Sequence, residues 1–164
     1  MAFLPSIEDD IDFTGLCRKW PALSGPIERL SIKLYDATFV SRRTASILFT
    51  YTAGLNRCGY CYERHTRNME RTGLEKGVMD ALLEDIASAP IEEEMKPLLE
   101  VCRKLTLEPS RLTQADVDAV LAAGWSEEAY NVVITICALS NYITRIISAH
   151  GIEDAGGVAE FGGE

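Results

Sequence analysis

The sequence lacks the patterns that β-structure requires. It has no hairpin dipeptide set between apolar runs and no stretch of alternating apolar and polar residues. Those two patterns are the main sequence signals of β-hairpins and half-buried strands. With 164 residues, 47% of them apolar, the chain is long enough to bury one hydrophobic core. These features predict a single all-α domain.

Basic residues are scarce, and so are long apolar runs. Lys and Arg number 16 against 25 Asp and Glu, and the resulting net charge of −9 argues against nucleic acid or an anionic membrane as a partner. The most apolar stretch, 132–147, is too short and too often broken by polar residues to span a membrane. The first ten residues, MAFLPSIEDD, lack a basic region and turn acidic where a secretory signal would be apolar. We therefore expect a cytoplasmic protein without a membrane partner.

The five cysteines are an odd number, which makes a poor disulfide framework and indicates a reducing compartment. Cys17, Cys102 and Cys137 fall on apolar stripes of expected helices. We expect these three in the core, where cysteine behaves as a small hydrophobic residue. Cys58 and Cys61 then need a separate explanation.

Helix signals recur along the whole chain. Apolar residues three and four apart, capping residues such as Ser126, and terminal glycines or prolines predict the helices. We expect them over 7–20, 26–35, 41–53, 58–72, 74–86, 95–105, 114–123 and 126–150. Segment 41–53 is apolar all round, which favours a core helix, although its Thr and aromatic residues also permit a strand.

The chain is expected to have three parts. An N-terminal helical segment, 1–40, packs on the core, the core itself spans 41–151, and a flexible glycine-containing tail covers 152–164. In the last helix, Asn141 and Arg145 are four apart and cannot stay unpaired cheaply, so we expect an internal pair or a place at the site or a subunit interface. His150, at the end of that helix, is a favourable partner for the helix dipole.

One group of residues carries chemistry: Cys58, Cys61 three residues on, and His65 four beyond that. On a helix these separations place the three side chains on one face. Thiols of a CxxC motif at a helix start have lowered pKa values, because unpaired backbone N–H groups favour a thiolate. Residues 41–71 hold six arginines against two glutamates, whereas 72–100 hold eight acids against two lysines. The motif therefore lies where positive charge prevails.

The spacing also bears on which sulfur attacks a substrate. His65 is one helical turn from Cys61 but nearly two turns, about 10 Å of rise, from Cys58. His65 is thus better placed to take a proton from Cys61, which makes Cys61 the attacking sulfur and Cys58 the resolving thiol. The helix N-terminus favours Cys58 instead. We give His65 more weight because it can both accept and return a proton.

Two alternatives to redox chemistry stay open at this motif. A structural zinc would need a fourth ligand, and the sequence has no second CxxC. The two cysteines could also be merely buried core residues. We expect neither a metal nor a cofactor.

The segment Leu55-Asn56-Arg57-Cys58-Gly59-Tyr60-Cys61, followed by His65 and Thr66, resembles the signature of the carboxymuconolactone decarboxylase and alkylhydroperoxidase D-like (AhpD-like) superfamily. Stretch 112–126, with Asn141 and Arg145, is similar to the C-terminal half of its peroxidase-related branch. The resemblance spans roughly residues 40–150. It implies an AhpD-like helical bundle that forms a homo-oligomer through its long helices.

The resemblance also implies thiol peroxidase chemistry. Cys61 would be oxidised to sulfenic acid, Cys58 would act as proton donor and resolving partner, and His65 would belong to the proton relay. The AhpD pattern has a glutamate twelve residues before the first cysteine, where this chain has Ser46, whose hydroxyl cannot serve as a carboxylate base. The chain also carries Tyr60 where well-known members have a histidine. Glu63 or a distant acid such as Asp36 could substitute for the glutamate.

We therefore expect a thiol-dependent oxidoreductase, an alkylhydroperoxidase-like antioxidant protein that reduces hydroperoxides through Cys58 and Cys61, with activity weakened by Ser46. Its partners would be a hydroperoxide or other small-molecule substrate and an unknown dithiol reductant. One alternative is a non-redox carboxymuconolactone-decarboxylase-like enzyme that uses His65 and carboxylates. The other is a non-catalytic zinc or interaction module.

Overall fold

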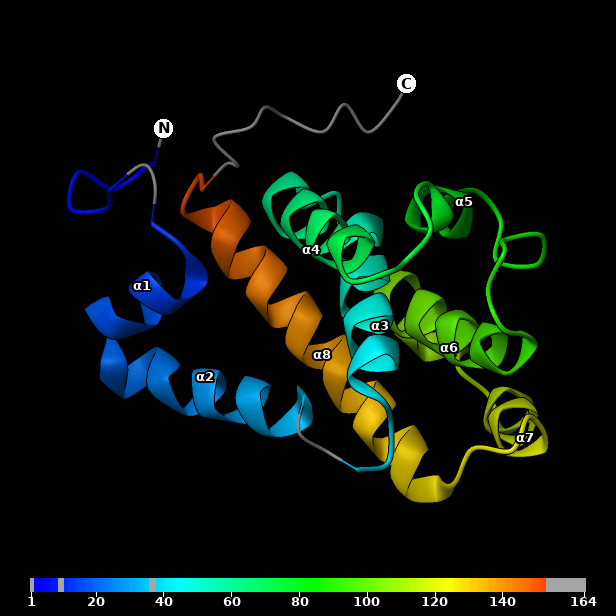
Figure 1. The fold of residues 1–164 in the computed structure, drawn as a ribbon. Helices are drawn as coiled ribbons and strands as arrows, with labels where there is room; N and C mark the ends of the chain where they lie inside the picture. Colours follow the sequence, from blue (N-terminus) through cyan, green and yellow to red (C-terminus); the bar gives the residue numbers. More distant parts are fainter. Residues whose placement is uncertain (1, 9–10, 36–37, 153–164) are drawn as a thin grey trace.

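The chain folds into helices from end to end, as Figure 1 shows. The computed structural model describes residues 2–8, 11–35 and 38–152, and no strand occurs among these residues. The elements are α1 Phe13–Lys19, α2 Pro21–Tyr35, α3 Arg42–Leu55, α4 Gly59–Arg71, α5 Val78–Glu84, the 3-10 helix η1 Glu93–Met95, α6 Lys96–Leu107, the 3-10 helix η2 Pro109–Arg111, α7 Gln114–Ala122 and α8 Glu127–Ala149. The all-α prediction is confirmed.

Helix α3 forms the centre of the core. Ten of its fourteen residues are buried, and it packs against α8, α4, α6 and α5. A helix enclosed on all sides needs an apolar surface all round. The core-helix interpretation of segment 41–53 is therefore confirmed, and the strand alternative is wrong.

The longest helix, α8, runs through the molecule beside α3, with α1 and α2 on one side and α5 to α7 on the other (Figure 1). Within the described ranges it is the one helix whose length and apolar composition would allow it to cross a membrane. It packs against both α3 and α6, and Val133, Ile136, Ile143 and Ile147 are buried there. Much of the apolar surface of α8 is therefore buried in the core.

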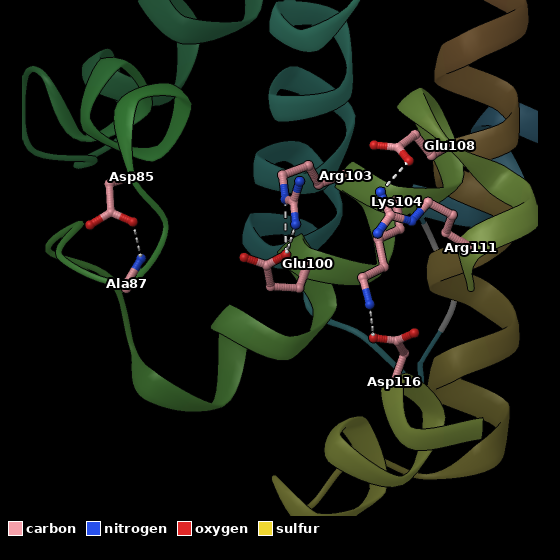
Figure 2. Close-up of polar contacts among 8 residues, drawn as sticks. All are labelled: Asp85, Ala87, Glu100, Arg103, Lys104, Glu108, Arg111 and Asp116. Carbon is pink, nitrogen blue, oxygen red and sulfur yellow. Dashed lines mark hydrogen bonds and ion pairs between the residues drawn. The ribbon is translucent and has the colours of Figure 1, made fainter. Parts of the chain in front are cut away.

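The predicted helix starts agree with the structure where a capping side chain was identified. The Ser126 hydroxyl accepts a hydrogen bond from the Ala129 N–H at 3.1 Å at the start of α8. The Thr113 and Asp116 side chains form a capping box at the start of α7. The Asp116 carboxylate also binds Lys104 of α6 at 2.6 Å, which ties α7 to α6 (Figure 2). These capping residues satisfy backbone N–H groups that a helix start leaves unpaired.

One core helix differs from the prediction at both of its ends. The helix expected over 74–86 is shorter and covers only α5, because Gly77 adopts a left-handed φ of 85° just before it. After α5, the Asp85 carboxylate accepts the N–H groups of Ala87 and Ser88 and forms a turn (Figure 2). Both ends are thus set by local turn geometry.

The N-terminal helices also begin at other residues than expected. Helix α1 starts only after Asp12, whose carboxylate accepts the Gly15 N–H at 2.7 Å. Helix α2 begins at Pro21, and Pro26 lies inside it. A proline is favourable at the first helical position because its missing N–H would have no partner there. Pro21 therefore starts α2 rather than ending α1.

Helix α2 packs on α8 and α3. Ile152, just beyond α8, is buried, and the rest of the tail expected over 152–164 lies outside the described residues. The division into an N-terminal segment, a core and a tail stays a prediction.

Candidate active site

The cysteine motif follows a tight turn between α3 and α4. Asn56 ends α3, and Arg57 takes a left-handed φ of 54°. The Cys58 N–H then bonds to the Ala53 carbonyl at 3.0 Å, and the extended Cys58 becomes the residue that precedes the first turn of α4. This turn reverses the chain and places the sulfur of Cys58 at the N-terminus of a thirteen-residue helix.

The turn is held from outside by α8. The Asn56 side-chain amide donates hydrogen bonds to Asn141 Oδ1 and Thr144 Oγ1, each at 3.0 Å. The Arg145 guanidinium bonds to the same Asn141 oxygen at 2.6 Å. Asn141 and Arg145 are therefore paired, although Arg145 is exposed rather than internal, and Asn141 also anchors the turn that precedes Cys58.

The two motif cysteines are free thiols, and both are buried. Cys58 is 3% exposed and Cys61 is 2% exposed. The Cys61 thiol interacts directly with Cys58, and this hydrogen bond lowers the pKa of Cys58 to about 7 even though burial opposes it. The same interaction, together with burial, raises the pKa of Cys61. A donor next to a sulfur favours its charged form. The interaction between the two thiols therefore favours the charged form of Cys58 over that of Cys61.

A cavity of about 210 Å³ lies against Cys61 and His65, and Cys58 is not among its lining residues. The cavity is bounded by side chains from α1, α2, α3, α4 and α8, which include Asp12, Tyr35, Phe49, Tyr60 and Arg64. Cys61 is thus the motif cysteine that lines a space where a small molecule fits.

His65 packs on Phe49, with the ring centroids 4.9 Å apart. Burial, with a smaller contribution from the Arg64 charge, lowers the pKa of His65 to about 4. At neutral pH the imidazole is therefore uncharged. His65 also lines two larger hollows of about 920 and 600 Å³, the first bordered by Arg64, Arg67 and Arg71. These arginines carry the positive charge that the sequence predicted around the motif.

Two polar residues of this cavity escaped the sequence analysis. Asp12 comes from the start of α1, and its Oδ2 lies 3.6 Å from Arg64 Nη2. Tyr35 comes from the end of α2, and its hydroxyl is buried beside Ser46. Burial raises the pKa of Tyr35 to about 12. A helix-capping signal marks Asp12 in the sequence, but nothing local places either residue beside Cys61.

The acids proposed as substitutes for the family glutamate have other positions. Glu63 lies 3.8 Å from Arg67 on α4, and its side chain is only 21% exposed, so it is not the solvated helix residue that the sequence suggested; it does not line the cavity at Cys61. Ser46 lines the hollow of about 600 Å³ with His65 but not the cavity at Cys61. Asp36 lies outside the described residues. Asp12 is the carboxylate that the fold brings to the cavity.

The other three cysteines and His150 lie where the sequence analysis placed them. Cys17, Cys102 and Cys137 are buried free thiols, so their placement in the core is confirmed. His150 ends α8, and its Nδ1 lies 2.7 Å from the Ile146 carbonyl oxygen. In the part of the chain that the structure describes, no three His, Cys, Asp or Glu side chains are grouped to hold a metal ion.

Comparison with solved structures identifies the fold as AhpD-like. A peroxidase-related protein from Silicibacter sp. TM1040, itself uncharacterized, superposes with a TM-score of 0.73 at 16% identity over 80% of this chain and 70% of that one. An uncharacterized peroxidase-related protein with an alkylhydroperoxidase AhpD core, from Ralstonia eutropha JMP134, gives 0.69 at 16% identity over 93% of this chain and 91% of that one.

No protein-family model and no curated protein matches the sequence. At 16% identity the structural likeness establishes the fold. The chain has the AhpD-like fold of peroxidase-related proteins, and the resemblance suggested by the motif is confirmed at that level.

Proposed function

We propose that this protein is a thiol-dependent oxidoreductase that reduces hydroperoxides with Cys61 and Cys58. The observation that carries the proposal is the position of Cys61. Cys61 lines a cavity of about 210 Å³, and its thiol interacts with Cys58, which does not line that cavity. A thiolate is the reactive form of cysteine, so a pair that needs only one internal proton transfer is ready to react.

The proton on Cys61 has to leave before Cys61 attacks. The Cys58 thiolate is its natural acceptor, because the two sulfurs interact directly and the pKa of Cys58 is about 7. His65 is a weaker acceptor, since its pKa is lowered to about 4. The proton-acceptor role that the spacing assigned to His65 therefore passes to Cys58 in this proposal. His65 orients the substrate or relays a proton as a neutral imidazole.

The hydroperoxide is reduced and the disulfide is formed in two steps. The Cys61 thiolate attacks the terminal oxygen of the hydroperoxide, the O–O bond breaks, and the leaving alkoxide takes the proton from Cys58 to become an alcohol. The regenerated Cys58 thiolate then attacks the sulfenic acid on Cys61, which forms the disulfide and releases hydroxide. A proton from solvent converts that hydroxide to water. An external dithiol then reduces the disulfide and restores both thiols.

The surrounding charges suit this sequence of steps. Arg64 stabilises negative charge that develops on the peroxide oxygens. Asp12, 3.6 Å from Arg64, supplies a carboxylate to the cavity at Cys61, which Ser46 does not line. We further propose that the protein works in the cytoplasm as a homo-oligomer, with a cytoplasmic dithiol as its electron donor.

The test is thiol loss under limiting hydrogen peroxide, with residues 58–64 followed by mass spectrometry as a single tryptic peptide. The wild type should lose two thiols per chain and form a Cys58–Cys61 disulfide in this peptide. Cys58→Ser should stop at a sulfenic acid on Cys61, which dimedone traps. Cys17→Ser is the matched control, because it removes a buried thiol outside the site, and it should behave as the wild type.

Equal thiol loss in the wild type and in Cys61→Ser would show that Cys61 is not the peroxide-reactive sulfur. A double variant, Cys58→Ser with Cys61→Ser, distinguishes the remaining alternatives. Full retention of a non-redox activity by the double variant would favour a decarboxylase-like enzyme. Stoichiometric zinc in the purified wild type would favour the metal-binding module.

A further inference from the structure

The core contains a second pair of thiols, distant from the CxxC motif in sequence. Cys102 lies on α6 and Cys137 on α8, and these two helices pack against each other. Both residues are 0% exposed. Cys137 Sγ lies 3.6 Å from the Cys102 carbonyl oxygen, and the interaction of the two thiols shifts the pKa of both. The two cysteines are therefore neighbours on adjacent helices, which is the arrangement that a disulfide between them requires.

The sulfur of Cys137 is also surrounded by polar groups, unlike a cysteine that only fills space. Three side chains reach it: Thr106 Oγ1 at 3.4 Å, Asn141 Nδ2 at 3.6 Å and Thr52 Oγ1 at 3.7 Å. These groups come from α6, α8 and α3, so the tertiary fold assembles them. Hydroxyl and amide donors aimed at a sulfur stabilise its thiolate form.

The charge distribution of this pair repeats that of the CxxC pair. The hydrogen bond from Cys102 is the main cause that lowers the pKa of Cys137 to about 7, and the Thr106, Thr52 and Asn141 donors act in the same direction. The interaction with Cys137, together with burial, raises the pKa of Cys102. One sulfur is therefore poised as a nucleophile and the other keeps its proton.

We propose that Cys102 and Cys137 form a second two-electron thiol centre, which hydrogen peroxide closes to a disulfide. The Cys137 thiolate attacks one peroxide oxygen, the O–O bond breaks, and the leaving hydroxide takes a proton from solvent to become water. The sulfenic acid on Cys137 then reacts with the Cys102 thiol. The S–S bond forms as the thiol proton and the sulfenic hydroxide leave together as a second water. A dithiol reductant reverses the oxidation.

Burial determines which oxidant reaches Cys102 and Cys137 and how fast the two thiols are oxidised. Neither sulfur lines a described cavity, so the oxidant must enter through local opening of the core. The smallest hydroperoxide is therefore favoured, and the centre reacts more slowly than Cys61. It responds to sustained excess of peroxide rather than to each turnover.

The experiment uses the Cys58→Ser, Cys61→Ser double variant, in which the motif cannot react, so that the result does not depend on the proposed function. The folded protein is treated with excess hydrogen peroxide, alkylated and digested with trypsin. We expect one cross-linked product that joins the Cys102 peptide to the Cys137 peptide, while Cys17 stays reduced. In the wild type the same link should appear after the Cys58–Cys61 link.

Two matched variants test the polar surroundings of Cys137. Thr106→Val removes the nearest hydroxyl, and the rate of Cys102–Cys137 linkage should fall about fivefold, which corresponds to one lost hydrogen bond. Thr135→Val changes a threonine of α8 whose hydroxyl bonds only to the exposed Asn131 carbonyl, and the rate should stay as before. Links of Cys17 to either residue would show oxidation of an unfolded chain and would overturn the proposal. So would a Cys137 that stays reduced under excess peroxide in both the double variant and the wild type.

Discussion

The thiolate on Cys58 depends on one neighbouring group, and removing that group gives a quantitative prediction. The Cys61 thiol is the main cause that lowers the pKa of Cys58 from 9.0 to about 7. A shift of two units corresponds to about 3 kcal/mol of preference for the charged form. Cys61→Ala removes the donor but leaves the burial, which raises the pKa. We therefore expect the pKa of Cys58 to rise by one unit or more.

At pH 7 the thiolate fraction of Cys58 should then fall from about one half to one tenth or less. Cys61→Ser keeps a donor in the same place. The pKa of Cys58 in this variant should therefore lie between its values in the wild type and in Cys61→Ala. The assay is the pH dependence of iodoacetamide alkylation, measured on the tryptic peptide 58–64, which contains no other cysteines. Because the measurement follows this peptide alone, alkylation of the thiolate expected on Cys137 does not contribute to it.

The result that would refute this reasoning is a midpoint that stays near pH 7 in Cys61→Ala. The thiolate would then be stabilised by the N-terminus of α4 and not by the Cys61 thiol. Circular dichroism of each variant checks that the fold is kept, and Cys17→Ser serves as the cysteine-deletion control.

Two further predictions concern stability. The pKa of His65 is lowered from 6.5 to about 4, so the unfolded chain binds a proton between these pH values that the folded chain does not. The free energy of unfolding should therefore fall as the pH drops from 6.5 to 4, by up to about 3 kcal/mol more in the wild type than in His65→Asn, with His150→Asn as the control in urea titrations. Gly54→Ala should lower the free energy of unfolding by about 1–2 kcal/mol, because its Cβ would lie 2.7 Å from Leu83 Cδ1 and 3.1 Å from Tyr62 Cδ2. A Gly54→Ala variant with unchanged stability would show that these side chains move aside freely.

Most of the fold could be predicted because its signals are local. The Ser126 cap of α8 and the Thr113 cap of α7 depend on residues within one helical turn. The prediction of the helix over 74–86 was too long, because an apolar repeat does not reveal that Gly77 turns left-handed or that Asp85 binds the backbone after α5. Turn geometry of this kind competes with helix periodicity and is weaker in sequence.

The candidate site was predictable only in the part that a single helix carries. Cys58, Cys61 and His65 share α4 or its first cap, so their spacing already related them. Asp12 and Tyr35 reach the same cavity from α1 and α2. Their sequence separation from the motif left no pattern that could connect them.

The sequence by itself determined that the chain is helical, that α4 begins at the CxxC motif and that Cys61 and His65 lie one turn apart. Helix periodicity and capping act over a few residues, so a linear pattern contains them. Only the tertiary structure decided which motif thiol keeps its proton and faces the cavity. It also paired Cys102 with Cys137, two residues that looked like independent core cysteines. Burial and hydrogen bonds between distant segments set a pKa, and these exist only when the helices pack together.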